Sequence, residues 1–174
     1  MRTGWIGAIG AAAMLAACSS SGSSSVAASP VAATNVAALT AAGFVEQAAS
    51  AALFAIEAAR LAEVRSSDAD VRRIARMQRE AGEAIGSQLS YAGPRVNAVP
   101  RNTLVPAHEA LLARLRAAPD FDDAYLEQQK DFVTSMRAFH RDYAVRGGSA
   151  TLRPVADYGA EKLDEQLQAI ERAD

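Results

Sequence analysis

The chain has 174 residues, and 18 Lys and Arg residues against 20 Asp and Glu residues give it a formal net charge of -2 at pH 7. This near balance excludes a general electrostatic attraction to nucleic acid or to anionic lipid. Half of the residues are hydrophobic, but only 6% are aromatic. The sequence is rich in Ala, Leu, Glu and Arg and poor in Thr and Ile, a composition that favours an all-α domain.

The N-terminal residues have the pattern of a secretory signal peptide. Arg2 supplies a positive start, an uncharged apolar run extends from Trp5 to Leu15, and small residues precede Cys18. The apolar run is shorter than the roughly 20 residues that a transmembrane helix needs. We therefore expect residues 1–17 to be a cleaved signal peptide.

The motif Leu15-Ala16-Ala17-Cys18 resembles the lipoprotein pattern of bacteria. The resemblance implies that the Cys18 thiol carries a diacylglycerol and that three acyl chains anchor the mature protein, more than the two that stable anchoring requires. Ser19 stands where an acidic residue would favour the inner membrane, which points to the outer membrane with the domain in the periplasm. Cys18 is the only cysteine, so an internal disulfide is excluded.

Serine and alanine dominate the residues that follow Cys18, up to about Leu39, and this segment carries no charge and no aromatic side chain. It offers too little apolar area to offset the entropy of ordering. We expect a flexible tether over residues 18–39 and one domain over residues 40–174, which is long enough to bury a core.

Four long stretches of the domain repeat apolar residues every three or four positions, as one face of a helix does. Thr40 caps the first stretch, and Ser66-Ser67-Asp68 ends it and caps the second, which ends before Gly93-Pro94. The inward positions of these two helices are Phe44, Ala48, Ala52, Ala55, Ile56, Ala59 and Ala62, followed by Val71, Ile74, Met77, Ala81, Ile85 and Leu89.

A proline-containing linker follows, with one or two amphipathic turns through Leu111, Leu112 and Leu115. Asp120 caps the third helix, and Gly147-Gly148-Ser149 separates it from the fourth. The inward positions of these helices are Phe121, Tyr125, Gln128, Phe132, Met136, Phe139 and Tyr143, followed by Leu152, Val155, Leu163, Leu167 and Ile170. The two short connections predict two antiparallel hairpins, and the long linker lets them pack as an antiparallel four-helix bundle.

Three segments carry a resemblance to a known family: residues 44–50 (FVEQAAS), residues 69–77 (ADVRRIARM) and residues 121–126 (FDDAYL). They are similar to the bacterial envelope family called domain of unknown function 4142, over roughly Phe44 to Arg172. The resemblance implies a ferritin-like four-helix bundle in a predicted outer-membrane protein. Members commonly carry histidines where this chain has Ala81, Val133 and Gln166, so a histidine-based role is not expected to carry over.

The two histidines do not fit a metal site. A ferritin-like di-iron site needs Glu-x-x-His pairs, but Val105 precedes His108 by three residues and Arg137 precedes His140. We expect no metal, no cofactor and no catalysis. His108 is placed at the start of the short helix and His140 at a partly exposed boundary, while the serines outside the tether are expected to be caps.

Arg72, Arg76 and Arg79 share one face of the second helix. An acidic residue stands four positions from each of them, so ion pairs are expected to neutralise the face. These acidic residues are Asp68, Glu80 and Glu83. We interpret the face as a solvated surface, with the binding of lipopolysaccharide phosphates or another anion as the alternative.

The sequence thus predicts a non-catalytic envelope lipoprotein that is anchored in the membrane through Cys18. We expect it to act as an interaction or structural module for an unknown envelope partner and not to bind nucleic acid. The alternative is a binder of a small or lipidic ligand within the bundle, lined by Gln128, Phe132, Met136 and Phe139. Gln128 interrupts the apolar stripe, and it either specifies helix register or contacts a ligand. A filled core with an exposed apolar patch favours the module, and an apolar cavity between the hairpins favours the ligand binder.

Overall fold

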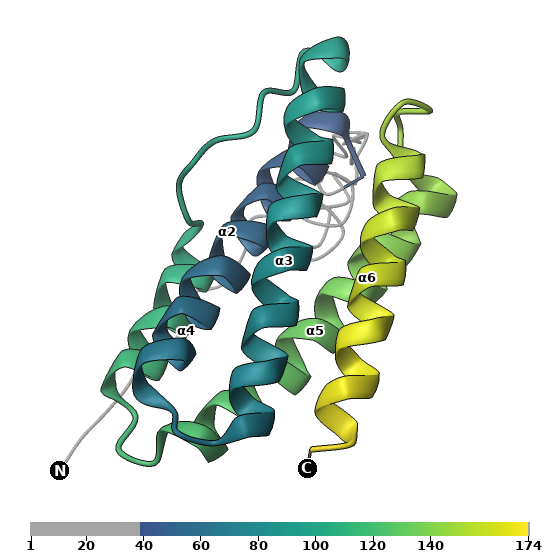
Figure 1. Ribbon diagram of the computed structural model, residues 1–174. Helices are drawn as coiled ribbons and strands as arrows, with labels where there is room; N and C mark the ends of the chain where they lie inside the picture. The colour runs from purple at the N-terminus through teal and green to yellow at the C-terminus, as the bar shows by residue number, and fades with distance from the viewer. Residues whose placement is uncertain (1–38, 174) are drawn as a thin grey trace, which may run out of the picture.

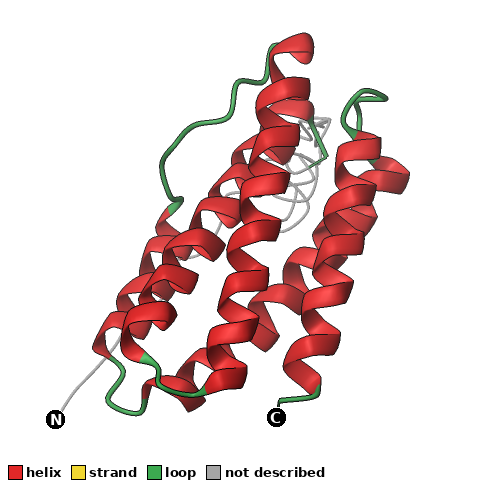
Figure 2. Cartoon of the chain, in the orientation of Figure 1, coloured by secondary structure: helices red, strands yellow, loops and turns green. Residues whose placement is uncertain are grey.

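The computed structural model describes residues 39–173, and every regular element in this part of the chain is helical. The prediction of an all-α domain is therefore confirmed (Figure 2). The elements are α2 (Ala41–Arg65), α3 (Ala69–Ala92), the short 3-10 helix η1 (Gly93–Val96), α4 (Pro106–Ala117), α5 (Phe121–Arg146) and α6 (Arg153–Glu171).

The helices pack in sequence-adjacent pairs, α2 with α3 and α5 with α6, and further contacts join α3 to α6 and α2 to α5. α4 lies on α2 and α5. At one end of the domain, the α2–α3 and α4–α5 connections lie near the C-terminus (Figure 1). We call the other end the Leu39 end: it contains Leu39, η1 and the α5–α6 turn, and the Gly148 N–H donates to the Leu39 carbonyl at 2.9 Å.

The capping residues behave as predicted at two of three sites. The Thr40 hydroxyl accepts the Gly43 N–H at 3.0 Å, and the Asp68 carboxylate accepts two N–H groups at the start of α3. Asp120 occupies the N-cap position of α5, but its side chain makes no capping hydrogen bond, so that prediction is wrong. α4 has 12 residues and is longer than the predicted one or two turns.

Small side chains on α2 face large ones on α5. The buried alanines of α2 leave room for the aromatic rings of Phe132 and Tyr143. Phe132 packs against Phe54 with ring centroids 4.5 Å apart, and Tyr143 stacks on Phe44 at 3.9 Å. Phe54 is absent from the predicted stripe, because α2 contacts α3, α4 and α5 and is buried over more than one face.

The backbone of α3 comes close to that of α2 at Gly82. A Cβ atom at this position would lie 2.8 Å from the Ala52 carbonyl oxygen, which belongs to the α2 backbone and cannot move aside alone. A Cβ atom at Gly86, one turn further along α3, would meet nothing within 4 Å. The two glycines therefore differ in a way that mutation can reveal.

We predict that Gly82→Ala lowers the free energy of unfolding by about 1–3 kcal/mol, because the added methyl group separates α2 from α3. Gly86→Ala is the matched control and should raise the free energy of unfolding by about 0.5–1 kcal/mol through helix propensity. Thermal unfolding followed by circular dichroism measures both changes. Equal effects of the two substitutions would contradict the close approach at Gly82.

Candidate functional site

A buried polar network joins α3 to α5, and Gln128, the predicted interior amide, is not part of it. The fully buried amide on α5 is Gln129, whose Oε1 accepts from Gln78 Nε2 at 3.2 Å. The Tyr125 hydroxyl donates to Gln78 Oε1. Gln128 is only partly buried, and its Nε2 donates to the Leu111 carbonyl of α4 at 3.1 Å. The prediction of Gln128 as the buried amide is wrong because α4 packs on the side of α5 that carries Gln128. This contact makes the apolar stripe of α5 wider than a single face of the helix.

A second polar contact joins α2 to α4. Ser50 is 1% exposed in the middle of α2, and its Oγ accepts the Val105 N–H at 2.8 Å and lies 2.7 Å from Nδ1 of His108. Burial lowers the pKa of His108, which favours a neutral ring that accepts the Ser50 hydroxyl proton at Nδ1. Ser50 is thus not a cap, contrary to the prediction, and it holds the start of α4 against α2.

His140 is buried, at 1% exposure, and the prediction of a boundary position is wrong. Its Nδ1 lies 3.3 Å from the Ala156 carbonyl of α6, to which it donates as a neutral ring. Gly159 makes room for the imidazole, because a Cβ atom there would lie 2.3 Å from Nδ1. Burial is the main cause that lowers the pKa of His140 to about 4.

An open groove of about 530 Å³ runs between α4 and α5. Gln128, Phe132 and Met136, three of the four predicted ligand-lining residues, contribute to its wall together with His108. Phe139 does not line this groove; its ring stacks on Phe44 at 5.5 Å nearer the Leu39 end. The groove lies outside the packing of the four long helices.

The space enclosed between the long helices is much smaller, at about 20 Å³. Phe132, His140 and Gln166 are among the residues around it. This volume suits about one water molecule. The interior of the described domain is therefore filled by its own side chains, and Phe132 forms part of the wall between this space and the groove.

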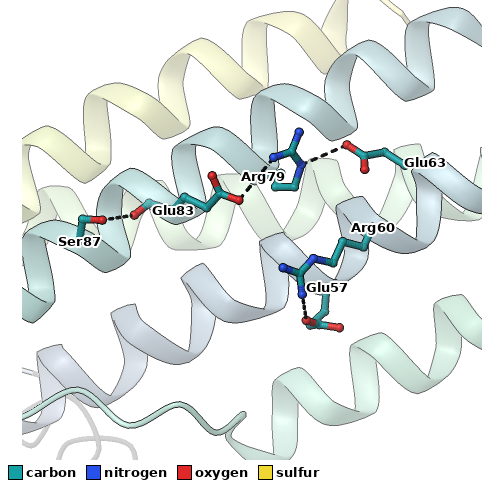
Figure 3. Close-up of polar contacts among 6 residues, drawn as sticks. All are labelled: Glu57, Arg60, Glu63, Arg79, Glu83 and Ser87. Atoms are coloured by element: carbon teal, nitrogen blue, oxygen red, sulfur yellow. Dashed lines mark hydrogen bonds and ion pairs between the residues drawn. The ribbon is translucent and has the colours of Figure 1, made fainter.

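Arg79 connects α3 to α2 on the surface of the domain (Figure 3). Its guanidinium donates to Glu63 of α2 at 3.1 Å and to Glu83 at 3.4 Å, the latter being the predicted pair four residues away. Arg79 is thus partly covered, whereas Arg72 and Arg76 are exposed. Of the three predicted pairs only Arg79–Glu83 forms, because no ion pair joins Arg72 to Asp68 or Arg76 to Glu80 within the described residues. On the neighbouring helix α2, Arg60 pairs with Glu57 at 2.8 Å.

The buried state of His140 predicts a pH-dependent stability. Because the unfolded chain takes up a proton near pH 6.5 and the folded chain does so only near pH 4, acidification between these values favours unfolding. His140 contributes up to about 3 kcal/mol to this loss. Urea unfolding at several pH values should show that the free energy of unfolding falls clearly less on acidification in His140→Gln than in the wild-type protein. An unchanged pH profile in the variant would contradict the assignment.

Cys18 and the predicted signal peptide lie outside the described residues. Among residues 39–173, no helix is long and apolar enough to cross a membrane, and no three His, Cys, Asp or Glu side chains gather in a group that could hold a metal ion.

No curated protein and no solved structure matches the chain significantly. One family model does match, over residues 26–173, and its description is Domain of unknown function (DUF4142). The match begins inside the segment that composition assigns to the tether and continues through α6. Since it covers most of the sequence, the chain belongs to the family called domain of unknown function 4142.

Proposed function

We propose that the chain is a lipoprotein of the bacterial envelope. Residues 1–17 direct export, Cys18 receives the lipid, and the domain that begins near residue 40 faces the periplasm from the outer membrane. The motif Leu15-Ala16-Ala17-Cys18 supports the anchor, and Ser19 supports the outer membrane. The described residues build a core of their own, which suits a domain held at the end of a lipid-anchored segment.

The domain in this proposal is a ferritin-like antiparallel four-helix bundle. In support, α2 contacts α3, α3 contacts α6, α6 contacts α5 and α5 contacts α2, so the four long helices form a closed ring of contacts. α4 is an addition on the outside of this ring, across α2 and α5.

The bundle acts as a non-catalytic interaction or structural module. The observation that carries this proposal is that buried polar side chains form hydrogen bonds to other groups of the domain: His108 bonds Ser50, His140 bonds Ala156, and Gln78 bonds Gln129. These side chains form internal contacts between helices, as residues that specify packing do. The filled interior supports the same function and favours it over a ligand held within the bundle.

A small or lipidic ligand is the second candidate, and the α4–α5 groove is where it would bind. The groove volume of about 530 Å³ falls in the range of small-molecule sites. Gln128 lines the groove, and Arg114, Glu127 and Asp131 add charged side chains to a mostly apolar wall. This combination of apolar and charged groups favours an amphipathic ligand.

The anchor is tested by replacing Cys18. We expect a labelled fatty acid fed to the cells to mark the wild-type protein and a Ser19→Ala control, but not Cys18→Ser, because serine has no thiol to carry the lipid. Density separation of the membranes should then place the wild-type protein in the outer membrane. Equal labelling of Cys18→Ser would overturn the lipoprotein assignment.

A further inference from the structure

Exposed apolar side chains gather at the Leu39 end of the domain. Among the described residues, the exposed large hydrophobic side chains are Val64, Tyr91, Val99 and Val145. Tyr91 is in the last turn of α3, Val99 follows η1, and Val145 is in the last turn of α5. Three of the four therefore lie at the end where Leu39 enters the fold, and only Val64 lies at the opposite end (Figure 1).

The same end is locally basic, although the whole chain has a net charge of -2. No acidic residue occurs between Glu83 and Glu109 or between Asp142 and Asp157, the two stretches that form most of the Leu39 end. These stretches contain Arg95, Arg101, Arg146 and Arg153. Residues 19–45 contain no charged side chain.

Two of these arginines are not neutralised by a carboxylate of the described residues. Arg153 Nε donates to the Gly147 carbonyl at 2.8 Å, and the Arg95 guanidinium donates to the Tyr91 carbonyl and lies 3.6 Å from the centre of the Tyr91 ring. Arg146 does pair with Asp142, and Arg101 approaches Glu46 at 4.0 Å. Arg95 and Arg153 thus remain available to an external anion.

The opposite end has a different charge pattern. The acidic residues of this end are accompanied by an equal number of arginines. The acidic residues are Asp68, Asp70, Asp120, Asp122, Asp123 and Glu171, and the arginines are Arg65, Arg72, Arg73, Arg114, Arg116 and Arg172. The opposite end is therefore close to neutral, whereas the Leu39 end has more arginines than carboxylates and attracts an anionic surface more strongly.

We propose that the Leu39 end docks on the anionic phospholipid headgroups of the membrane in which Cys18 is anchored. Arg95 and Arg153 bind headgroup phosphates, for which the planar guanidinium is suited. Tyr91, Val99 and Val145 enter the boundary between headgroups and acyl chains, as apolar side chains of peripheral proteins do. This inference rests on the proposed lipid anchor at Cys18.

The anchor alone does not set this orientation. The chain between Cys18 and Leu39 is long enough to span up to about 70 Å when extended. Either end of the domain could then reach the bilayer, and the surface chemistry decides which one does. The basic and apolar Leu39 end is the one that matches an anionic bilayer surface.

The orientation is tested with the full acylated protein in vesicles. Val99→Cys and Val64→Cys each add one free thiol, since Cys18 is acylated, and each thiol receives the same fluorophore. With a quencher on the lipid headgroups of phosphatidylglycerol-containing vesicles, we expect several-fold stronger quenching at residue 99 than at residue 64. The difference should shrink in pure phosphatidylcholine vesicles.

Charge variants supply the matched control. Arg95→Gln combined with Arg153→Gln should abolish the preference for phosphatidylglycerol at residue 99, whereas Arg72→Gln combined with Arg73→Gln, towards the opposite end, should retain it. Equal quenching at residues 99 and 64 in protein that floats with the vesicles would overturn the docking inference alone. Failure of the wild-type protein to float would overturn the proposed anchor as well.

Discussion

The small cross-section of α2 is the constraint on which the rest of the domain depends. Its buried face is formed mainly by alanines, and α3, α4 and α5 all contact this one helix. Gly82 brings the α3 backbone close to the Ala52 carbonyl, and Phe132 of α5 packs against Phe54. A larger side chain in the alanine face would separate α2 from its neighbours, because a closely packed interior has no space to accommodate it.

The same alanine face accounts for the polar contacts of the core. Alanine side chains cannot form hydrogen bonds, so each buried polar group beside them needs a partner from another element. Ser50 finds the Val105 N–H and His108, and Gln78 of α3 finds Gln129 and Tyr125 of α5. These contacts fix how α4 and α5 are placed. Burial lowers the pKa of both His108 and His140, which favours neutral rings.

Helix positions and most caps could be predicted from the sequence because their signals are local. The three- and four-residue spacing and the residues Thr40 and Asp68 located α2 and α3 without knowledge of their neighbours. Gln129 was missed because α5 has a second covered side under α4, which widened its apolar stripe. The burial of His140 depends on Gly159 of the facing helix, and no local pattern signals that pairing.

Ser50 did leave a signal in the sequence, as the one polar residue within the run of alanines at 48–52. A hydroxyl in such a run is buried with the alanines and needs a hydrogen-bond partner, either a carbonyl of its own helix or a group on a neighbouring element. The α4–α5 groove could be anticipated only in part: Gln128, Phe132 and Met136 were selected from α5 alone, whereas the other wall comes from α4.

Native-state hydrogen exchange tests the central role of α2 most directly. Amides of a helix that packs against several neighbours exchange only when much of the domain unfolds, whereas those of a helix at the edge exchange through local opening. The account predicts the slowest exchange in the buried middle of α2, around residues 48–62, and clearly faster exchange in α4. Exchange in α2 as fast as in α4 would contradict it.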